Sequence, residues 1–190
     1  MSQTTIRLAV ENDAEEVAAI YGPVVTHTPI SFEWQPPTAD EMRSRIVATR
    51  TAQLPWIVLE RDGRVMGYAY AGRHRGERAA YRWSVESSLY IHPDARRTGV
   101  GRALYTSLFA LLTAQGFVNV YAGATLPNEG SVGLHAAMGF REVGVYRNVG
   151  FKFDTWHDVI WWYLRLVDHP LAPELPRGLD EAMADGGTAA

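Results

Sequence analysis

The sequence contains no cysteine among its 190 residues. This absence excludes disulfide bonds, thiolate metal sites and a cysteine nucleophile, although it leaves the compartment open. No apolar run approaches the roughly 20 residues that a membrane-spanning helix requires. The polar start, Met1 to Ile6, also lacks the apolar core of a signal peptide. We therefore expect a soluble, cytoplasmic protein with no membrane partner.

An excess of basic residues is also missing, since the formal net charge at pH 7 is −3. Nothing in the charge therefore favours a nucleic-acid partner. The histidines, at positions 27, 74, 92, 135, 157 and 169, show no paired metal-site spacing. We expect no metal cofactor.

Prolines and glycines become frequent after residue 167, and the chain ends in Gly186-Gly187-Thr188-Ala189-Ala190. The length before that point suffices for one domain with a full core. We expect a single domain over residues 1–167 and a loosely ordered, Pro/Gly-rich C-terminal tail over residues 168–190.

Apolar periodicity and turn signals predict a mixture of strands and helices. The expected strands cover residues 6–10, 56–60, 65–71, 80–91, 118–124, 140–146 and 159–166, and the expected helices begin near residues 13, 38, 103 and 128. Pro23 should kink or interrupt the first helix, whereas Thr38 and Glu41 form a capping box for the second. The fold class is α/β, with a mixed, mostly antiparallel sheet flanked by helices on both faces.

A basic glycine turn joins the expected strand 80–91 to the helix that follows, and reads Arg96-Arg97-Thr98-Gly99-Val100-Gly101-Arg102. The first turn of a helix has unpartnered N–H groups and a partial positive charge. Glycines without Cβ atoms let a bulky anion approach the main chain, and arginines add full charges. The turn therefore predicts a pyrophosphate cradle, although a plain strand-to-helix turn would also explain the glycines.

Glu86 is a lone carboxylate in the otherwise uncharged run from Trp83 to Ile91. In a regular strand it shares one face with Arg82, Ser84, Ser88 and Tyr90. It is either a surface or ion-paired glutamate, or a general base that removes a proton from an ammonium substrate.

Two residues of the expected helix from residue 128 are further candidates. Asn128 is either a helix N-cap or an amide contact to a ligand. His135 lies two helical turns later, as either a packed histidine or a proton donor.

The remaining candidates lie in connections. The stretch Arg73-His74-Arg75-Gly76-Glu77-Arg78, next to Tyr81, is either a solvated hairpin or a mouth that grips an anionic group. Phe32 and Trp34, in the loop 26–37, either plug the edge of the core or line a pocket. The run Trp156-His157-Asp158 reads as structural, because adjacent strand residues point to opposite sides.

The glycine turn matches the pattern Arg/Gln-x-x-Gly-x-Gly/Ala, and so resembles the acetyl-CoA loop of the GCN5-related N-acetyltransferase (GNAT) superfamily. Several further segments resemble its phosphinothricin and methionine sulfoximine/sulfone N-acetyltransferase branch, over roughly residues 6–167. They are Tyr68-Ala69-Tyr70-Ala71-Gly72, the run from Tyr81 to Ile91, Ala114-Gln115-Gly116-Phe117, Leu126-Pro127-Asn128, the run from His135 to Phe140, Gly150-Phe151-Lys152 and the run from Trp156 to Val159. The resemblance implies the GNAT fold, acetyl-CoA as co-substrate and a homodimer.

The resemblance also implies site residues. Glu86 and His135 would be the catalytic pair, with His135 at the position of a tyrosine found in many family members. The coenzyme contacts would be Leu89, Tyr90, Ile91, Arg96, Arg97, Thr98, Gly99, Val100, Gly101, Arg102 and Asn128. The substrate contacts would be Phe32, Arg73, Arg75, Arg78, Tyr81, Ser88, Tyr90 and Arg97.

The sequence therefore predicts an N-acetyltransferase for the amino group of a small amino-acid analogue, such as phosphinothricin or methionine sulfoximine. The acetyl group would pass directly to the amine, since no cysteine exists to carry it, with Glu86 as general base. Two alternatives stay open. One is a GNAT enzyme that acetylates a protein N-terminus or another small amine, and the other is a non-catalytic acyl-CoA-binding module.

Overall fold

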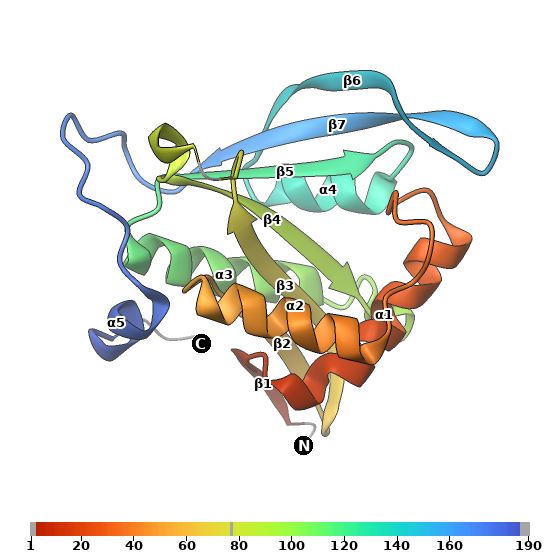
Figure 1. Cartoon of the computed structure of the whole chain (residues 1–190), viewed down its shortest axis with the longest axis horizontal. Helices are drawn as coiled ribbons and strands as arrows, with labels where there is room; N and C mark the ends of the chain where they lie inside the picture. The colour runs from red at the N-terminus through yellow and green to blue at the C-terminus, as the bar shows by residue number, and fades with distance from the viewer. Residues whose placement is uncertain (1–2, 77, 187–190) are drawn as a thin grey trace.

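The computed structural model describes residues 3–76 and 78–186. Its centre is a seven-stranded sheet with the strand order β1-β2-β3-β4-β5-β7-β6, shown in Figure 1. The strands are β1 (Thr4–Leu8), β2 (Trp56–Arg61), β3 (Arg64–Arg73), β4 (Ser84–Ile91), β5 (Asn119–Thr125), β6 (Arg141–Lys152) and β7 (Thr155–Arg165). The helices are α1 (Ala14–His27), α2 (Ala39–Thr51), α3 (Val100–Gln115), α4 (Glu129–Ala137) and α5 (Leu179–Ala184).

The sheet is mixed and mostly antiparallel, as the sequence predicts. Of the strand pairs described, β4 and β5 run parallel and the others antiparallel. Figure 1 shows α2 in front of the sheet and α3 behind it. No helix among the described residues is both long enough and apolar enough to cross a membrane.

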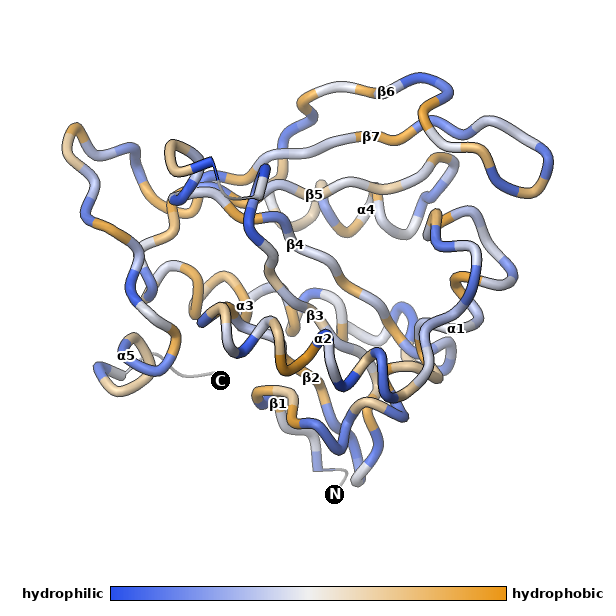
Figure 2. The backbone as a smooth tube through the Cα atoms, in the orientation of Figure 1, coloured by the Kyte–Doolittle hydropathy of each residue, from blue (hydrophilic) through white to orange (hydrophobic). Residues whose placement is uncertain are grey.

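Each face of the sheet has its own apolar core. On one face, α3 buries Leu104, Leu108, Leu111 and Leu112 completely, because residues three and four apart share one side of a helix. On the other face, α1 and α2 pack against side chains such as Trp56 and Tyr68. The hydropathy colouring in Figure 2 shows apolar segments recurring along these elements.

Local signals in the sequence place several element ends correctly. The Thr38 side chain accepts a hydrogen bond from the Glu41 N–H at 3.2 Å, and Glu41 returns one to the Thr38 N–H at 2.7 Å, which is the expected capping box. Asp62 and Gly63 both adopt positive φ angles, 52° and 77°, as a tight hairpin turn between β2 and β3 requires.

Three expectations about element bounds are wrong. The strand expected from residue 80 begins only at Ser84, because Ala79–Tyr81 forms a 3-10 turn that the Arg82 side chain ties to the Ala79 carbonyl. Helix α1 continues through Pro23, so the proline does not interrupt it, and a kink at this point stays a prediction. The last two strands are longer than expected, and their register shifts between Tyr146 and Gly150, which breaks the alternation that would mark them.

The expectation of a loosely ordered tail also differs from the structure, as far as residue 186; residues 187–190 lie outside the described residues. The Arg177 N–H donates to the Gln115 carbonyl at the end of α3 at 2.7 Å. Trp83 donates its ring N–H to the Glu174 carbonyl at 2.6 Å. Leu179 is fully buried in the α3-side core. The described part of the tail therefore packs on the domain, since the buried side chains of Leu179 and Ala182 and these hydrogen bonds hold it there.

Candidate active site

The central feature of the candidate site is the divergence of two neighbouring strands. β4 and β5 pair only where Ser84–Glu86 faces Asn119–Tyr121. Beyond that point β4 continues to Ile91 and β5 to Thr125 without pairing with each other, and Figure 1 shows them moving apart. Glu86 is therefore the last residue of β4 that pairs with β5. The main chain of β4 beyond it has an edge that β5 does not occupy.

The glycine turn lies where β4 leads into α3. Gly99 has a left-handed φ of 89° directly before Val100, where the 16-residue helix begins. Arg96, Arg97 and Arg102 are exposed. The ion pairs found within residues 3–76 and 78–186 involve none of these three arginines. A helix N-terminus and three arginines without ion pairs suit a polyanion.

The two glycines of this turn have different roles. A Cβ on Gly99 would meet no heavy atom within 4 Å, so its φ angle is the reason for a glycine there. A Cβ on Gly101 would lie 3.0 Å from Ile91 Cδ1 and 3.0 Å from Leu134 Cδ2. Gly101 therefore allows α3 to pack closely against β4 and α4. That its missing Cβ also lets an anion approach the main chain stays a prediction.

Glu86 has a close partner at the divergence. Its Oε1 lies 2.9 Å from Nδ1 of His74, which follows β3. The side chain of Glu86 is 40% exposed, whereas that of His74 is only 11% exposed. A carboxylate that is partly accessible and held on one oxygen can receive a proton on the other.

Glu86 and His135 lie on opposite faces of the sheet. Side chains alternate along β4, so Glu86 and Ser87 point in opposite directions. Ser87 Oγ lies 3.5 Å from the Tyr105 hydroxyl on α3, and that hydroxyl lies 3.0 Å from His135 Nε2. His135 therefore belongs to the α3 side, and it and Glu86 do not form a contacting pair in this structure.

The His135 ring is buried in the core, where it stacks on Trp162 with centroids 4.4 Å apart. Burial lowers the pKa of His135, against the raising effect of its hydrogen bond to the Ser131 carbonyl. Nδ1 lies 2.8 Å from that carbonyl, so Nδ1 is the donor and the neutral ring accepts from Tyr105 through Nε2. Burial also raises the pKa of Tyr105 to about 12.

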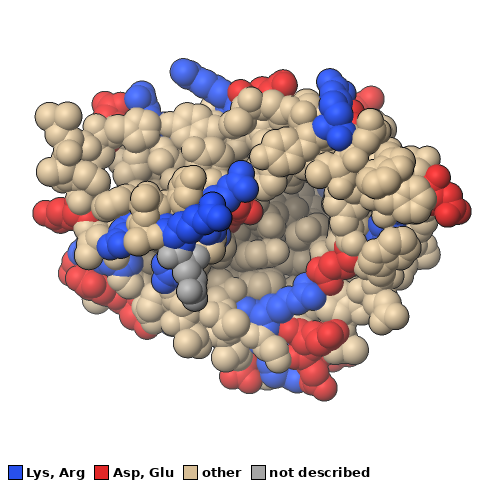
Figure 3. All heavy atoms as spheres, turned by 45° about the horizontal axis from the view of Figure 1, so that its top comes forward, with Lys and Arg blue, Asp and Glu red and all other residues tan. Residues whose placement is uncertain are grey.

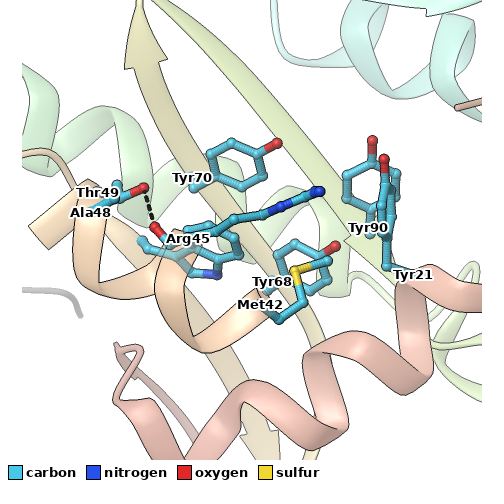
Figure 4. A pocket seen from close by; sticks show the side chains of 9 residues that line it. Tyr21, Met42, Arg45, Ala48, Thr49, Tyr68, Tyr70 and Tyr90 are labelled. Atoms are coloured by element: carbon cyan, nitrogen blue, oxygen red, sulfur yellow. Dashed lines mark hydrogen bonds between the residues drawn. The ribbon is translucent and has the colours of Figure 1, made fainter. Parts of the chain in front are cut away.

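A cavity of about 260 Å³ lies on the Glu86 face, between α2 and the sheet. Its lining is mainly aromatic, with Arg45 reaching across it from α2 in Figure 4, and comprises Tyr21, Met42, Arg45, Ala48, Thr49, Trp56, Tyr68, Tyr70 and Tyr90. The rings of Trp56 and Tyr70 stack 4.3 Å apart. The cavity thus combines apolar walls with hydroxyl and guanidinium donors.

An ion pair borders this cavity. Arg45 donates from both terminal nitrogens to Glu33, at 2.8 and 2.9 Å, and the Tyr21 hydroxyl donates to the same carboxylate at 2.8 Å. The Arg45 hydrogen bond holds the pKa of Glu33 below its usual value, against burial. Burial raises the pKa of Tyr21 to about 12. The loop between α1 and α2 is therefore joined to α2 by a charged contact.

The loop between α1 and α2 is also held by β6. The Lys152 ammonium donates to the Val25 and Ser31 carbonyls, both at 2.6 Å, and the side chain is buried. Burial lowers the pKa of Lys152. Phe32 lies over Gly150, where a Cβ would come within 2.2 Å of the ring. Two strand residues thus position the loop that carries the predicted substrate contact Phe32.

The predicted substrate contacts do not gather in one cavity. Arg73, Arg78 and Tyr81 line a separate groove of about 700 Å³ beside His74, with the tail at Leu175–Gly178 as another part of its lining. Figure 3 shows a hollow on one face, with basic side chains along one border. The other predicted contacts lie elsewhere. Tyr90 lines the aromatic cavity, and Ser88 on β4 is paired with Tyr70 on β3. Arg75 lies 3.5 Å from the Tyr146 hydroxyl, and Arg97 belongs to the glycine turn.

Asn128 caps α4, since its side-chain oxygen accepts from the Ser131 N–H at 3.1 Å.

The run Trp156-His157-Asp158 has the structural role expected of it. His157 bonds to the Lys152 carbonyl, while Asp158 binds Arg147 and the Asn148 N–H. No group of three or more His, Cys, Asp or Glu side chains in the described part of the chain could hold a metal ion.

Comparison with known proteins places this architecture in a family. The family model described as "Acetyltransferase (GNAT) domain" matches residues 6–161. The chain belongs to the GNAT acetyltransferases. This match confirms the fold and the enzyme class that the sequence predicts.

Within that family, the chain is similar to several individual enzymes. Phosphinothricin N-acetyltransferase of Alcaligenes faecalis is 43% identical over 168 residues, which cover 88% of this chain and 82% of the relative. L-methionine sulfoximine/L-methionine sulfone acetyltransferase of Salmonella typhimurium is 32% identical over 87% of this chain and 96% of the relative. Among solved structures, a phosphinothricin acetyltransferase from Sinorhizobium meliloti in complex with AcCoA has a TM-score of 0.84 at 35% identity, covering 90% of this chain and 93% of that one.

Sequence reasoning missed several residues near the site. His74 belongs to the stretch from Arg73 to Arg78, but its contact with Glu86 depends on the register in which Gly72 faces Glu86. The contact of Arg45 with Glu33, which follows the predicted contact Phe32 in the sequence, joins residues 12 apart and has no local signal. Lys152 carries no local signal, since its partners lie more than 120 residues away.

Proposed function

We propose that this protein transfers the acetyl group of acetyl-CoA to the amino group of a small amino-acid analogue of the phosphinothricin or methionine sulfoximine type. The observation that carries the proposal is the position of Glu86, an accessible carboxylate at the point where β4 and β5 part. The relatives' names supply the acceptor type.

The coenzyme is proposed to lie in the opening between β4 and β5. Its pyrophosphate would bind the turn from Arg96 to Arg102 and the N-terminus of α3. Its pantetheine arm would follow the main chain of Leu89, Tyr90 and Ile91 and reach Asn128. The unpaired edge of β4 and the free arginines support this placement, and the Sinorhizobium meliloti relative was solved with AcCoA.

The proposed chemistry is a direct transfer. Glu86 removes a proton from the acceptor ammonium, because only the neutral amine is nucleophilic. The amine nitrogen then attacks the thioester carbonyl carbon, the carbon–sulfur bond breaks, and the thiolate leaves and takes up a proton. A main-chain N–H near Tyr90 or Ile91 would stabilise the oxyanion. A cysteine-bound acetyl intermediate is excluded, since the chain has no cysteine.

His135 takes part in the proposal only through Tyr105. The Tyr105 hydroxyl lies within hydrogen-bonding reach of both His135 Nε2 and Ser87 Oγ, and Ser87 is the first β4 residue beyond the pairing with β5. Since the Tyr105 hydroxyl donates to the unprotonated Nε2 of His135, its proton would have to turn towards Ser87 before this route could protonate the departing thiolate. Direct contact of His135 with Glu86 forms no part of the proposal.

The acceptor is proposed to lie between the two cavities. Its carboxylate would meet Arg73, Arg75 or Arg78, since a guanidinium binds carboxylates with two parallel hydrogen bonds. Its side chain would enter the aromatic cavity, where Arg45 and tyrosine hydroxyls can donate to oxygens at its tip. A phosphinate or a sulfoximine on a short apolar stem fits this combination of walls and donors.

A homodimer in the cytoplasm completes the proposal. Exposed apolar side chains cluster on β6, β7 and the turn between them, where Figure 2 shows apolar stretches: Val143, Val149, Phe151, Phe153 and Trp156. Such a cluster favours burial against a second copy. Sedimentation equilibrium should give twice the mass of the chain, and a monomer at micromolar concentration would contradict the dimer. Acetyl-CoA in the cytoplasm would supply the co-substrate.

The test measures acetyl-CoA turnover with a panel of amines. The assay detects the free thiol of coenzyme A that each transfer releases. The protein has no cysteine and therefore no thiol of its own, so the thiol signal comes from the coenzyme alone. Fast turnover with phosphinothricin or methionine sulfoximine supports the proposal. Turnover only with peptide N-termini would favour a protein substrate, and tight acetyl-CoA binding without acetylation of any amine would favour a binding module.

A further inference from the structure

We infer that His74 is a positioning residue for Glu86, which it holds in the orientation needed to receive the acceptor's proton. The inference rests on the proposed function and adds a residue that the sequence did not assign to the reaction. Nδ1 of His74 lies 2.9 Å from Oε1 of Glu86. This contact occupies one carboxylate oxygen and leaves Oε2 for the amine.

The imidazole itself is firmly held. Its ring lies nearly parallel to that of Tyr121 on β5, with centroids 4.4 Å apart and planes 14° apart. The Tyr81 ring meets it edge-on at 5.5 Å. The His74 N–H donates to the Ser84 carbonyl, a longer contact of 3.4 Å. Contacts with Tyr121 on β5 and with Tyr81 in the connection between β3 and β4 thus fix the imidazole ring before any substrate binds.

Glu86 needs such support. Its side chain is 40% exposed, and His74 is its one hydrogen-bonding partner among the residues described. A free glutamate samples many rotamers, and fixing it costs conformational entropy. Holding it in advance places the carboxylate within reach of the amine, and a displacement of about 1 Å at a reacting group can cost about 100-fold in rate.

Register explains why His74 can do this. Gly72 faces Glu86 across β3 and β4, and the side chain two residues after Gly72 lies on the same face of the sheet. Gly72 has no side chain to separate the two groups. His74, two residues after Gly72 and directly after the end of β3, is therefore placed where its side chain can reach the carboxylate.

Two substitutions separate the hydrogen bond from the stacking. His74→Phe keeps a flat ring against Tyr121 but removes the donor, and His74→Asn keeps an N–H close to the position of Nδ1 but removes the ring. We expect kcat to fall by about 10- to 100-fold in His74→Phe and to recover at least partly in His74→Asn. The dissociation constant for acetyl-CoA should not change. His27→Phe, at an exposed histidine at the end of α1, is the matched control and should keep the wild-type rate.

A double substitution shows whether His74 acts through Glu86. In the Glu86→Gln background, whose residual rate is measured at high enzyme concentration, His74→Phe should cause little further loss. An equal loss in both backgrounds would overturn the inference, because His74 would then act independently of Glu86. A wild-type rate in His74→Phe would overturn it too.

The proposed function can fail separately from this inference. If wild-type protein acetylates no amine, the proposed function and the inference fall together. If wild-type protein is active and Glu86→Gln is slow, but His74→Phe keeps full activity, only the role of His74 is wrong. Melting temperatures of all variants show whether a lost rate comes from unfolding.

Discussion

The ring of Phe32 lies directly against the main chain of Gly150: a Cβ at position 150 would be 2.2 Å from Phe32 Cζ and 2.4 Å from Cε2. Phe32 belongs to the loop between α1 and α2, and Gly150 to β6. The contact joins two segments that are distant in sequence, and Lys152 strengthens it with hydrogen bonds to the carbonyls of Val25 and Ser31. The loop that we place beside the acceptor is thus fixed by the β6–β7 hairpin.

The first prediction uses this contact. Gly150→Ala must displace the Phe32 ring, because no real Cβ tolerates such a distance. We expect the KM for the acceptor to rise by about 3- to 30-fold, corresponding to about 0.7–2 kcal/mol of lost positioning, with the acetyl-CoA dissociation constant unchanged. Gly22→Ala, where the nearest atom is 3.9 Å away, is the matched control in steady-state kinetics. An unchanged acceptor KM in Gly150→Ala would remove Phe32 from the acceptor site.

The second prediction tests the pyrophosphate cradle. Arg102 is exposed in the first turn of α3 and forms no ion pair with a described carboxylate. Arg102→Glu replaces attraction to a polyanion by repulsion while leaving the helix intact. Calorimetry should show acetyl-CoA affinity weakened by about 10- to 100-fold, and more strongly at low salt. Arg64→Glu, in the β2–β3 hairpin, should bind like wild type. If Arg102→Glu and Arg64→Glu bound acetyl-CoA with the same affinity, the pyrophosphate would lie elsewhere.

The third prediction concerns the C-terminal tail. Leu179 is fully buried against the α3-side core. Leu179→Ala should lower the free energy of unfolding by about 2–5 kcal/mol, as measured by urea denaturation. Leu171→Ala is the control, because Leu171 is fully exposed, and it should change stability by less than about 0.5 kcal/mol. If both variants match wild type, the tail is not docked in solution.

The fourth prediction concerns acid stability. Burial raises the pKa of Asp13, but hydrogen bonds from Arg7, at 2.7 and 2.8 Å, and from the Val10 N–H outweigh it and leave the pKa below its usual value. A lowered carboxyl pKa stabilises the fold above the unfolded-state value of about 4, and this stabilisation is lost as the pH falls through the folded-state value. Asp13→Asn should therefore cost about 1–3 kcal/mol at pH 7 and flatten the loss of stability between about pH 5 and pH 2.

The control for this acid effect is Asp168→Asn, since Asp168 is 93% exposed and pairs with Arg165 at the surface. Surface pairs contribute little, so its melting curves should follow wild type across the same pH range. A wild-type pH profile for Asp13→Asn would contradict the stabilising role of the Arg7 contact.

Features that depend on neighbouring residues could be predicted from the sequence. The leucine spacing of α3, the capping box at Thr38 and the Asp62-Gly63 turn each act within a few residues, so propensity and periodicity reveal them. Glu86 was also a candidate from the sequence, because it is the lone carboxylate in an otherwise uncharged strand, and its catalytic role stays a proposal. Such local signals sufficed for the order of elements, whereas the family was recognised from the glycine turn and the further segments that resemble the GNAT branch.

Features that depend on register or on distant contacts could not be predicted in this way. The contact of His74 with Glu86 requires the pairing of β3 with β4, and a 3-10 turn in the connection hides that register. The packing of Gly101 against Leu134 and the docking of Leu179 involve elements that lie far apart in the chain. The position of His135 on the opposite face from Glu86 follows from alternation along β4, combined with a contact through Tyr105 that no local pattern encodes.

The central claim is that Glu86 takes the proton from the acceptor amine. The most direct measurement is the turnover of acetyl-CoA with the best acceptor in Glu86→Gln, compared with wild type and with Glu15→Gln at an exposed position on α1. We predict that kcat falls by about 10²- to 10⁴-fold in Glu86→Gln, that the acetyl-CoA dissociation constant is unchanged and that Glu15→Gln behaves like wild type. A wild-type rate in Glu86→Gln would contradict the account.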